Sequence, residues 1–92
     1  MANFKKREAK GIIFVGHHVS GQSIKREIKE GDNVVLRIDN ESVLVRNVHL
    51  VSRSHFIGEV YGFEPSFALE YQGINIGYKV EFEEEHIISC SD

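Results

Sequence analysis

Residues 56–88 read FIGEVYGFEPSFALEYQGINIGYKVEFEEEHII and decide the fold, because most of the aromatic residues lie in this stretch. It contains four of the six phenylalanines, all three tyrosines and the only proline, Pro65. Strand-like runs lie at both ends, over residues 55–63 and 78–82. Aromatic and β-branched residues suit a pleated surface that is buried on one side. We therefore expect the core of a β-sheet to concentrate here, with the N-terminal half packed against it.

The composition is that of a single small globular domain. Of the 92 residues, 41% are hydrophobic and 27% are charged, which excludes a disordered chain. No run approaches the roughly 18 apolar residues of a membrane-spanning helix, and the apolar run at 12–15 is too short for a signal-peptide core of about 7–15 residues. One cysteine, Cys90, cannot form an internal disulfide, which is typical of a reducing compartment. We expect a cytoplasmic protein of bacterial type without a membrane partner.

Short strand-like segments continue through the rest of the chain, over residues 11–19, 34–38, 42–51 and 87–90. Glycine, asparagine and aspartate lie between them, and turns favour these residues. This spacing favours an all-β fold, an SH3-like small barrel or roll of five to six mostly antiparallel strands with at most a short helical turn. We expect residues 1–10 to form a polar lead-in and residues 11–92 to form the single β-barrel domain.

Two segments allow alternative interpretations. Residues 42–51 carry apolar side chains on both faces of a strand. This indicates either a strand covered on both sides or one that bends between layers of a barrel. Residues 64–72 show a strand period, yet Ser66 can cap a helical turn that Gly73 ends. The sequence does not decide between loop, helical turn and strand for this segment.

A pattern of an apolar anchor, a glycine and an alternating strand occurs twice, beginning at Ile28 and at Ile74. In both copies the glycine follows the anchor by three positions, at Gly31 and Gly77. Glycine there permits a positive φ ahead of the strand. We interpret the pattern as one turn device used twice rather than as a duplication, because repeat architectures need at least about three copies.

The second copy carries a resemblance to known domains. FIGEV at 56–60, a loop containing Pro65, the spacing G-x-x-V-x-F from Gly77 and the closing Ile87 are similar to small bacterial SH3-like β-barrel domains of unknown function. The similarity extends over about residues 30–90. Some of those domains occur among accessory or mobile-element genes and immunity-type proteins. The resemblance implies the fold and carries no catalytic residue.

The sequence offers no pattern typical of an enzyme or a metal site. His17 and His18 are adjacent, so on a strand they face opposite sides and only one of them can share a site with His49 or His55. The Cys-x-x-Cys and His-Glu-x-x-His spacings are absent. On a strand, His86 and Cys90 would lie about 13 Å apart, too far for a nucleophile and its base. We predict a protein that is not an enzyme and has no catalytic residues, no metal and no cofactor.

The aromatic residues within 61–78 form the most plausible functional surface. Small barrels bind peptides or nucleotides on aromatic-lined faces between loops. The simpler interpretation is that these rings fill the core of a chain without tryptophan. Phe63 and Phe67 flank a proline loop and are expected to be partly exposed. Our first hypothesis is a non-enzymatic module that contacts a protein partner or a second copy of the chain through four residues, Phe63, Pro65, Phe67 and Tyr71.

Charge is distributed unevenly along the chain. Residues 1–29 carry seven basic and two acidic groups, a net charge of +5, whereas residues 30–92 carry four basic and twelve acidic groups, a net charge of −8. One interpretation is that the two parts neutralise each other within the fold or across a dimer. The alternative is a nucleic-acid-binding barrel with a basic N-terminal arm, although nucleic-acid binders usually have a basic domain. That arm consists of Lys5, Lys6, Arg7, Lys10, Lys25, Arg26 and Lys29.

Overall fold

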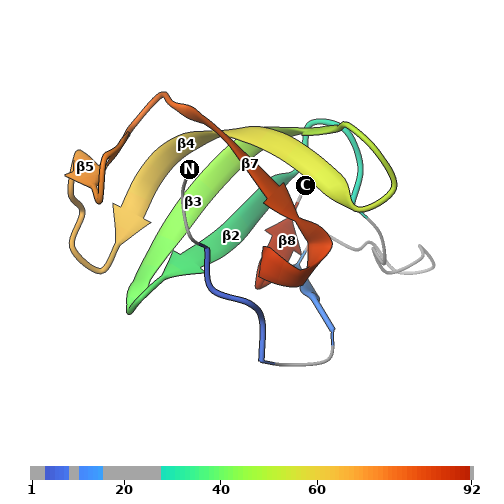
Figure 1. Cartoon of the computed structure of the whole chain (residues 1–92), viewed down its shortest axis with the longest axis horizontal. Coiled ribbons are helices and arrows are strands. Elements are labelled where there is room, and N and C mark those ends of the chain that lie inside the picture. The colour runs from blue at the N-terminus through green and yellow to red at the C-terminus, as the bar shows by residue number, and fades with distance from the viewer. Residues whose placement is uncertain (1–3, 9–10, 16–27, 92) are drawn as a thin grey trace.

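Within the residues that the structure describes, 4–8, 11–15 and 28–91, six strands form one sheet and two more form a small ribbon (Figure 1). The elements of this computed structural model are β1 (Ile13–Val15), β2 (Asn33–Ile38), β3 (Glu41–Leu50), β4 (His55–Glu64), β5 (Glu70–Tyr71), β6 (Ile74–Asn75), β7 (Lys79–Glu83), the 3-10 turn η1 (Glu84–His86) and β8 (Ser89–Ser91). Every described pairing is antiparallel except β1 with β8. The prediction of a mostly β, mainly antiparallel fold with a short helical turn is confirmed.

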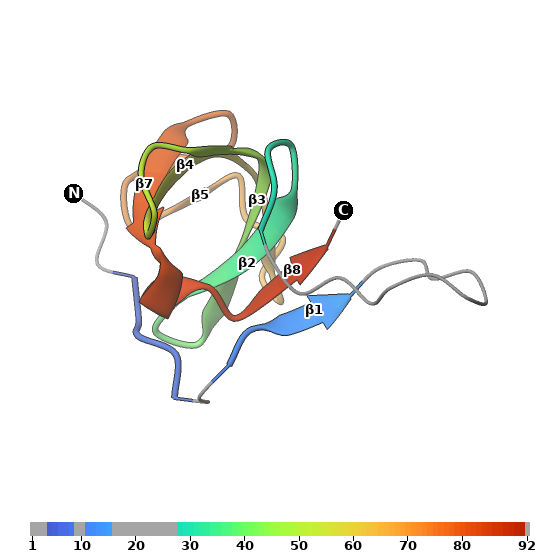
Figure 2. The ribbon, with the colours of Figure 1, turned by 90° about the vertical axis from the view of Figure 1, so that its right-hand side faces the viewer.

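The sheet has the strand order β1-β8-β2-β3-β4-β7, with β5 and β6 paired separately. In a flat sheet β8 and β7 would lie four strand spacings apart, about 19 Å. Residues 84–88 link β7 to β8 and contain η1. Because a 3-10 turn rises only about 2.0 Å per residue, this link is too short to span that distance. The sheet therefore curls strongly about its core (Figure 2). No described pairing joins β1 to β7, so the sheet is open in its hydrogen bonding.

Strand β3 bends at a bulge. Val43 and Val45 are buried, and the next buried residue is Val48. The side chains that point inward therefore change from odd-numbered to even-numbered positions between Val45 and Val48. Asn47 has a φ of 53° and lies within a shift of the β3–β4 register. Because a one-residue shift turns every later side chain to the opposite face, the bulge directs apolar residues from both faces into one core. Of the two interpretations of the strand at 42–51, the structure therefore shows the one in which the strand bends.

Strands β3 and β4 approach each other closely at Gly58. A Cβ atom at this position would lie 2.4 Å from the Cγ1 atom of Val45 and 3.2 Å from the carbonyl oxygen of Arg46. Gly58 is buried between Phe56 and Val60, two core residues of β4. A side chain has no space here, so glycine allows the bend of β3 to pack directly on β4.

The two glycines of the repeated pattern adopt the predicted conformation. Gly31 has a φ of 88° ahead of β2, and Gly77 has a φ of 96° ahead of β7. The anchor Ile74 is buried, and Ile28 packs against the core. The apolar residues that follow each glycine are also buried, namely Val34, Leu36, Val80 and Phe82. The interpretation of a turn device used twice is therefore confirmed.

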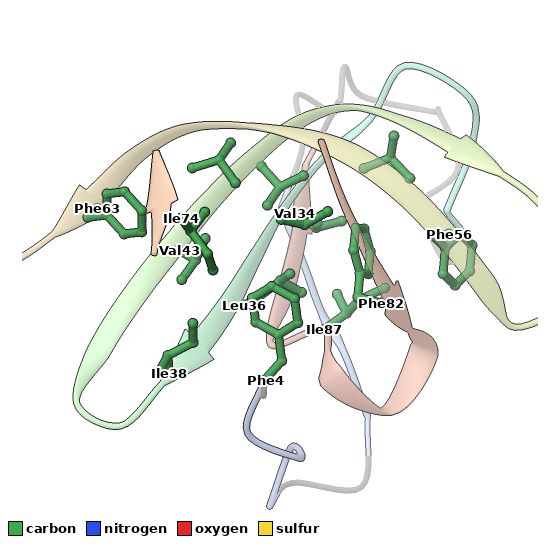
Figure 3. Close-up of a cluster of buried hydrophobic side chains, with 14 of the residues drawn as sticks. Phe4, Val34, Leu36, Ile38, Val43, Phe56, Phe63, Ile74, Phe82 and Ile87 are labelled. Atoms are coloured by element: carbon green, nitrogen blue, oxygen red, sulfur yellow. The ribbon is translucent and has the colours of Figure 1, made fainter. Parts of the chain in front are cut away.

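The core lies inside the curl of the sheet and receives residues from both ends of the chain (Figure 3). Phe63, Phe82 and Ile87 are among its most buried side chains. Phe4 also belongs to this core, and the N–H of Lys5 donates to the carbonyl oxygen of Arg37 at 2.7 Å. The sequence sets residues 1–10 apart as a polar lead-in, whereas residues 4–8 pack against the sheet as part of the fold.

The ambiguous segment is an irregular loop followed by a hairpin. Residues 65–69 form a turn and irregular chain, after which β5 and β6 pair through a two-residue turn. That turn is Gln72 and Gly73, with φ angles of 50° and 85°. Two successive positive φ angles suit a tight hairpin turn. Gly73 thus turns a hairpin and does not end a helix. Of the predicted strand at 11–19, the structure shows β1, and residues 16–19 lie outside the described residues.

Candidate functional site

Five large apolar side chains are exposed around the connection from β4 to β7, and we call them the apolar patch. They are Tyr61, Phe67, Leu69, Ile76 and Tyr78. Phe67 is 77% exposed and Leu69 is 78% exposed. The N–H of Ile76 donates to the carbonyl oxygen of Leu69 at 3.2 Å, which joins the two sides of the patch. Single exposed apolar residues are ordinary, but a contiguous group of them marks a binding surface.

A groove of about 410 Å³ runs beside the apolar patch. It is lined by Leu44, Tyr61, Gly62, Phe63, Glu64, Phe67, Ala68 and Ile76. The half-buried Gly62 has no side chain to fill the groove, and Glu64 is the only charged residue among the described residues that line it. The volume lies within the range of about 300–1,000 Å³ that is usual for sites of small ligands. The groove is therefore apolar, with one carboxylate at its edge.

A buried carboxylate holds the loop that presents Phe67. Glu41, at the start of β3, is buried and accepts hydrogen bonds from the backbone N–H of Ser66 at 3.2 Å and from the Ser66 hydroxyl. The hydroxyl oxygen in turn accepts the N–H of Ala68 at 3.2 Å. Since a buried charge is costly unless it is hydrogen-bonded, this carboxylate ties the loop to the sheet. The loop geometry is thus set by contacts within the fold.

The backbone of Phe67 has a strained conformation. Its φ is 54°, a left-handed value that costs a residue other than glycine about 1–2 kcal/mol. Its N–H donates to the carbonyl oxygen of Phe63 at 3.1 Å. Strain of this kind persists where the surroundings fix the backbone, and it clusters at functional sites. Here its result is a phenyl ring directed to solvent and not to the core.

The structure separates the four residues predicted to contact a protein. Phe67 and Pro65 are exposed, and the peptide bond before Pro65 is cis. Phe63 is only 1% exposed, so the expectation that it is partly exposed is wrong. The register shift between Leu44 and Val45 turns Phe63 into the core, where its ring centroid lies 6.0 Å from that of the half-buried Tyr71.

Leu69 and Ile76 belong to the patch but do not stand out in the sequence. Leu69 looks like part of an alternating strand, and Ile76 lies between the turn residues Asn75 and Gly77. A large aliphatic residue inside a turn is the one signal that indicates exposure for Ile76. For Leu69 no such signal exists, because its exposure depends on where β5 begins.

The basic residues near the N-terminus are partly used within the fold. The Arg7 guanidinium donates to the carbonyl oxygens of Glu84 at 2.9 Å and Ile87 at 2.7 Å, and it pairs with the Glu84 carboxylate at 3.2 Å. Lys6 lies 3.8 Å from the carboxylate of Glu85. These contacts follow the interpretation that the two parts of the chain neutralise each other. Lys29 is exposed, while Lys10, Lys25 and Arg26 lie outside the described residues.

The described histidines and the cysteine belong neither to the apolar patch nor to the described lining of the groove. His49 pairs with the Glu30 carboxylate at 2.8 Å, and an N–H bond from Leu50 together with His49 lowers the pKa of Glu30. Cys90 is buried, with its Sγ atom 3.5 Å from a carboxylate oxygen of Asp32.

Neither a cluster of metal-ligand side chains nor a membrane-spanning helix occurs in the part of the chain that the structure describes. No three histidine, cysteine or acidic residues there group as metal ligands; His17 and His18 fall outside it. Nor does any helix in that part have the length and apolar character needed to cross a bilayer.

Comparison with protein-family models, with curated proteins and with solved structures finds no match for this chain.

Proposed function

We propose that this chain is a non-enzymatic, cytoplasmic interaction module that binds a short apolar segment of a partner protein through the apolar patch. The observation that carries the proposal is the exposure of Phe67 and Leu69 on a loop that a buried carboxylate ties to the sheet. A folded chain gains no stability from holding large apolar side chains in water. Binding of a partner that covers them is favourable, because apolar surface is removed from water.

The scaffold for this function is a small SH3-like barrel. Its support is the antiparallel succession β2-β3-β4-β7, followed by the 3-10 turn η1 and by β8, which returns to pair with β2. The bulges of β3 and the close approach at Gly58 supply the curvature that such a barrel needs. In this scaffold the apolar patch lies around the connection from β4 to β7.

The ordered loop makes binding favourable for a small contact. Fully burying a phenylalanine or leucine side chain contributes about 1.5–3 kcal/mol. Phe67 and Leu69 are both more than three-quarters exposed, so nearly all of that contribution is available to a partner. Because Glu41 already fixes Ser66, little conformational entropy is lost on binding.

The size and charge of the site indicate the kind of partner. The patch has only five exposed side chains. The largest apolar patch of a monomer usually covers about 300–600 Å², whereas a stable interface takes about 800 Å² from each partner. The patch therefore suits a peptide segment better than a stable homodimer. Glu64 is the only charged side chain that the described part of the groove lining contains, so a lysine or arginine beside the apolar anchor of the partner would complement it.

A library of random linear peptides, selected on the full chain, tests this function. We expect enriched peptides to carry an apolar anchor next to a basic residue. Phe67→Ser and Leu69→Ser should each weaken binding at least about fivefold, from the lost burial. Glu64→Gln should weaken it less and reduce its dependence on salt. The matched control is Val51→Ser, since Val51 is 59% exposed but lies in the β3–β4 turn, outside the patch.

Three results would overturn the proposal. The first is that selection enriches no peptide, and the second is that the enriched peptides bind Phe67→Ser as tightly as the unchanged chain. Sedimentation equilibrium provides the third: self-association at micromolar concentration that Phe67→Ser abolishes would make a second copy the occupant. Circular dichroism of each variant verifies folding, and exposed substitutions of this kind normally change stability by less than about 0.5 kcal/mol.

A further inference from the structure

We infer that a second surface, a pocket between the N-terminal segment and β2, binds a phosphate group. The pocket has a volume of about 290 Å³. Its polar lining consists of Lys5, Lys6, Arg7, Glu8, Arg37 and Asn40, and we call it the basic pocket. It shares no lining residue with the apolar groove, so the inference does not depend on the function proposed above.

Long-range contacts assemble the basic pocket. The N–H of Lys5 donates to the carbonyl oxygen of Arg37 at 2.7 Å, which makes the N-terminal segment a neighbour of the end of β2. Phe4 anchors this segment in the core on one side. On the other side, the Arg7 guanidinium donates to two carbonyl oxygens around η1, and the backbone N–H of Arg7 donates to the carbonyl oxygen of Glu85 at 2.8 Å. The pocket is thus held by the fold and does not need a ligand to form.

The positive charge of the pocket is only partly balanced. Lys6 faces the carboxylate of Glu85, and Arg7 pairs with that of Glu84. Lys5 and Arg37 have no carboxylate partner among the residues that the structure describes, and Glu8 is the one acidic residue in the lining. A local excess of positive charge in a chain of net charge −3 attracts anions to this pocket.

The donors fit a phosphate group. An arginine guanidinium presents two parallel N–H groups to phosphate oxygens, and a lysine ammonium adds a compact positive charge. Asn40 at the β2–β3 turn supplies an amide that can donate a neutral hydrogen bond. The described lining contains no aromatic ring on which a nucleobase could stack. The lining residues therefore favour binding of a phosphate group and not of a nucleobase.

Titration of the isotopically labelled full chain with pyrophosphate, followed by backbone amide shifts and calorimetry, tests this site. We expect saturable shifts at residues 5–8 and 37–40. Arg37→Ala and Lys5→Ala should each weaken binding by about tenfold, because each removes a charge-assisted contact. Glu8→Gln should tighten it, since the repelling carboxylate is gone. Arg53→Ala is the matched control, as Arg53 is an exposed arginine outside the pocket.

A parallel titration with single-stranded oligothymidylate distinguishes free phosphate ligands from a phosphodiester backbone. Binding of either probe that Arg37→Ala weakens and Arg53→Ala does not supports the site, and the tighter probe identifies the source of the phosphate. The inference is overturned if neither probe binds at millimolar concentration, or if Arg53→Ala weakens binding as much as Arg37→Ala. It is also overturned if Glu8→Gln has no effect on the affinity for either probe.

Discussion

Replacing Gly58 with alanine tests whether the close approach of β3 and β4 determines the stability of this fold. The added Cβ atom would lie 2.4 Å from the Cγ1 atom of Val45, well inside van der Waals contact. Val45 is completely buried and branched at Cβ, so it has few other rotamers to adopt. The carbonyl oxygen of Arg46 lies 3.2 Å away, which limits movement of the backbone as well.

The expected loss can be estimated from two opposing effects. Overpacking of a core costs about 1–3 kcal/mol. Replacing glycine with alanine reduces the entropy of the unfolded chain, which raises the free energy of unfolding by about 0.4–1 kcal/mol. We therefore expect Gly58→Ala to lower the free energy of unfolding by about 1–2 kcal/mol. Gly62→Ala is the control, because its Cβ atom would meet only the tip of the half-buried Leu44 side chain, at 3.2 Å.

Urea unfolding followed by far-ultraviolet circular dichroism measures both variants. A double-mutant cycle with Val45→Ala then identifies the clash, because removing Cγ1 makes room for the new methyl group. We expect the double variant to be more stable than the sum of the single effects predicts, by at least about 0.5 kcal/mol. A steric clash at this position is contradicted if Gly58→Ala is as stable as Gly62→Ala, or if the two effects in the cycle are additive.

Substitutions at three further positions test other parts of the structure. Asn47→Val should lower the free energy of unfolding by about 1–2 kcal/mol, whereas Asn47→Gly should be nearly neutral, because Asn47 has a φ of 53° at the bulge of β3; urea unfolding measures both. Glu41→Ala should cost about 1–3 kcal/mol and speed amide hydrogen exchange at Ser66, whose N–H would lose its acceptor. The lowered pKa of Glu30 means that its carboxylate stabilises the fold above the pKa of the unfolded chain. This contribution disappears as the pH falls through the lower pKa of the folded chain. The difference in unfolding free energy between the unchanged chain and Glu30→Gln should therefore be present at pH 7 and shrink toward pH 3, and a difference that grows on acidification would contradict this.

The N-terminal segment illustrates what a sequence pattern does not reveal. Residues 4–8 are mostly charged and have no strand or helix period, so they look like a lead-in. Phe4 nevertheless packs into the core, and Arg7 binds backbone carbonyls close to the opposite end of the chain. Contacts across such a distance in sequence depend on which elements become neighbours in space, and local patterns carry no such information.

The sequence by itself determined the local features of this protein. The alternation of apolar residues predicted the strands, and the spacing of Gly31 and Gly77 predicted two turns with positive φ, because both depend only on neighbours along the chain. Only the tertiary structure decided which aromatic side chains are exposed. Phe63 and Phe67 flank the same proline, yet a register shift in the β3–β4 pairing buries the first, and a left-handed backbone exposes the second. A shift of one residue reverses the face of every later side chain, so exposure depends on strand pairing and not on composition.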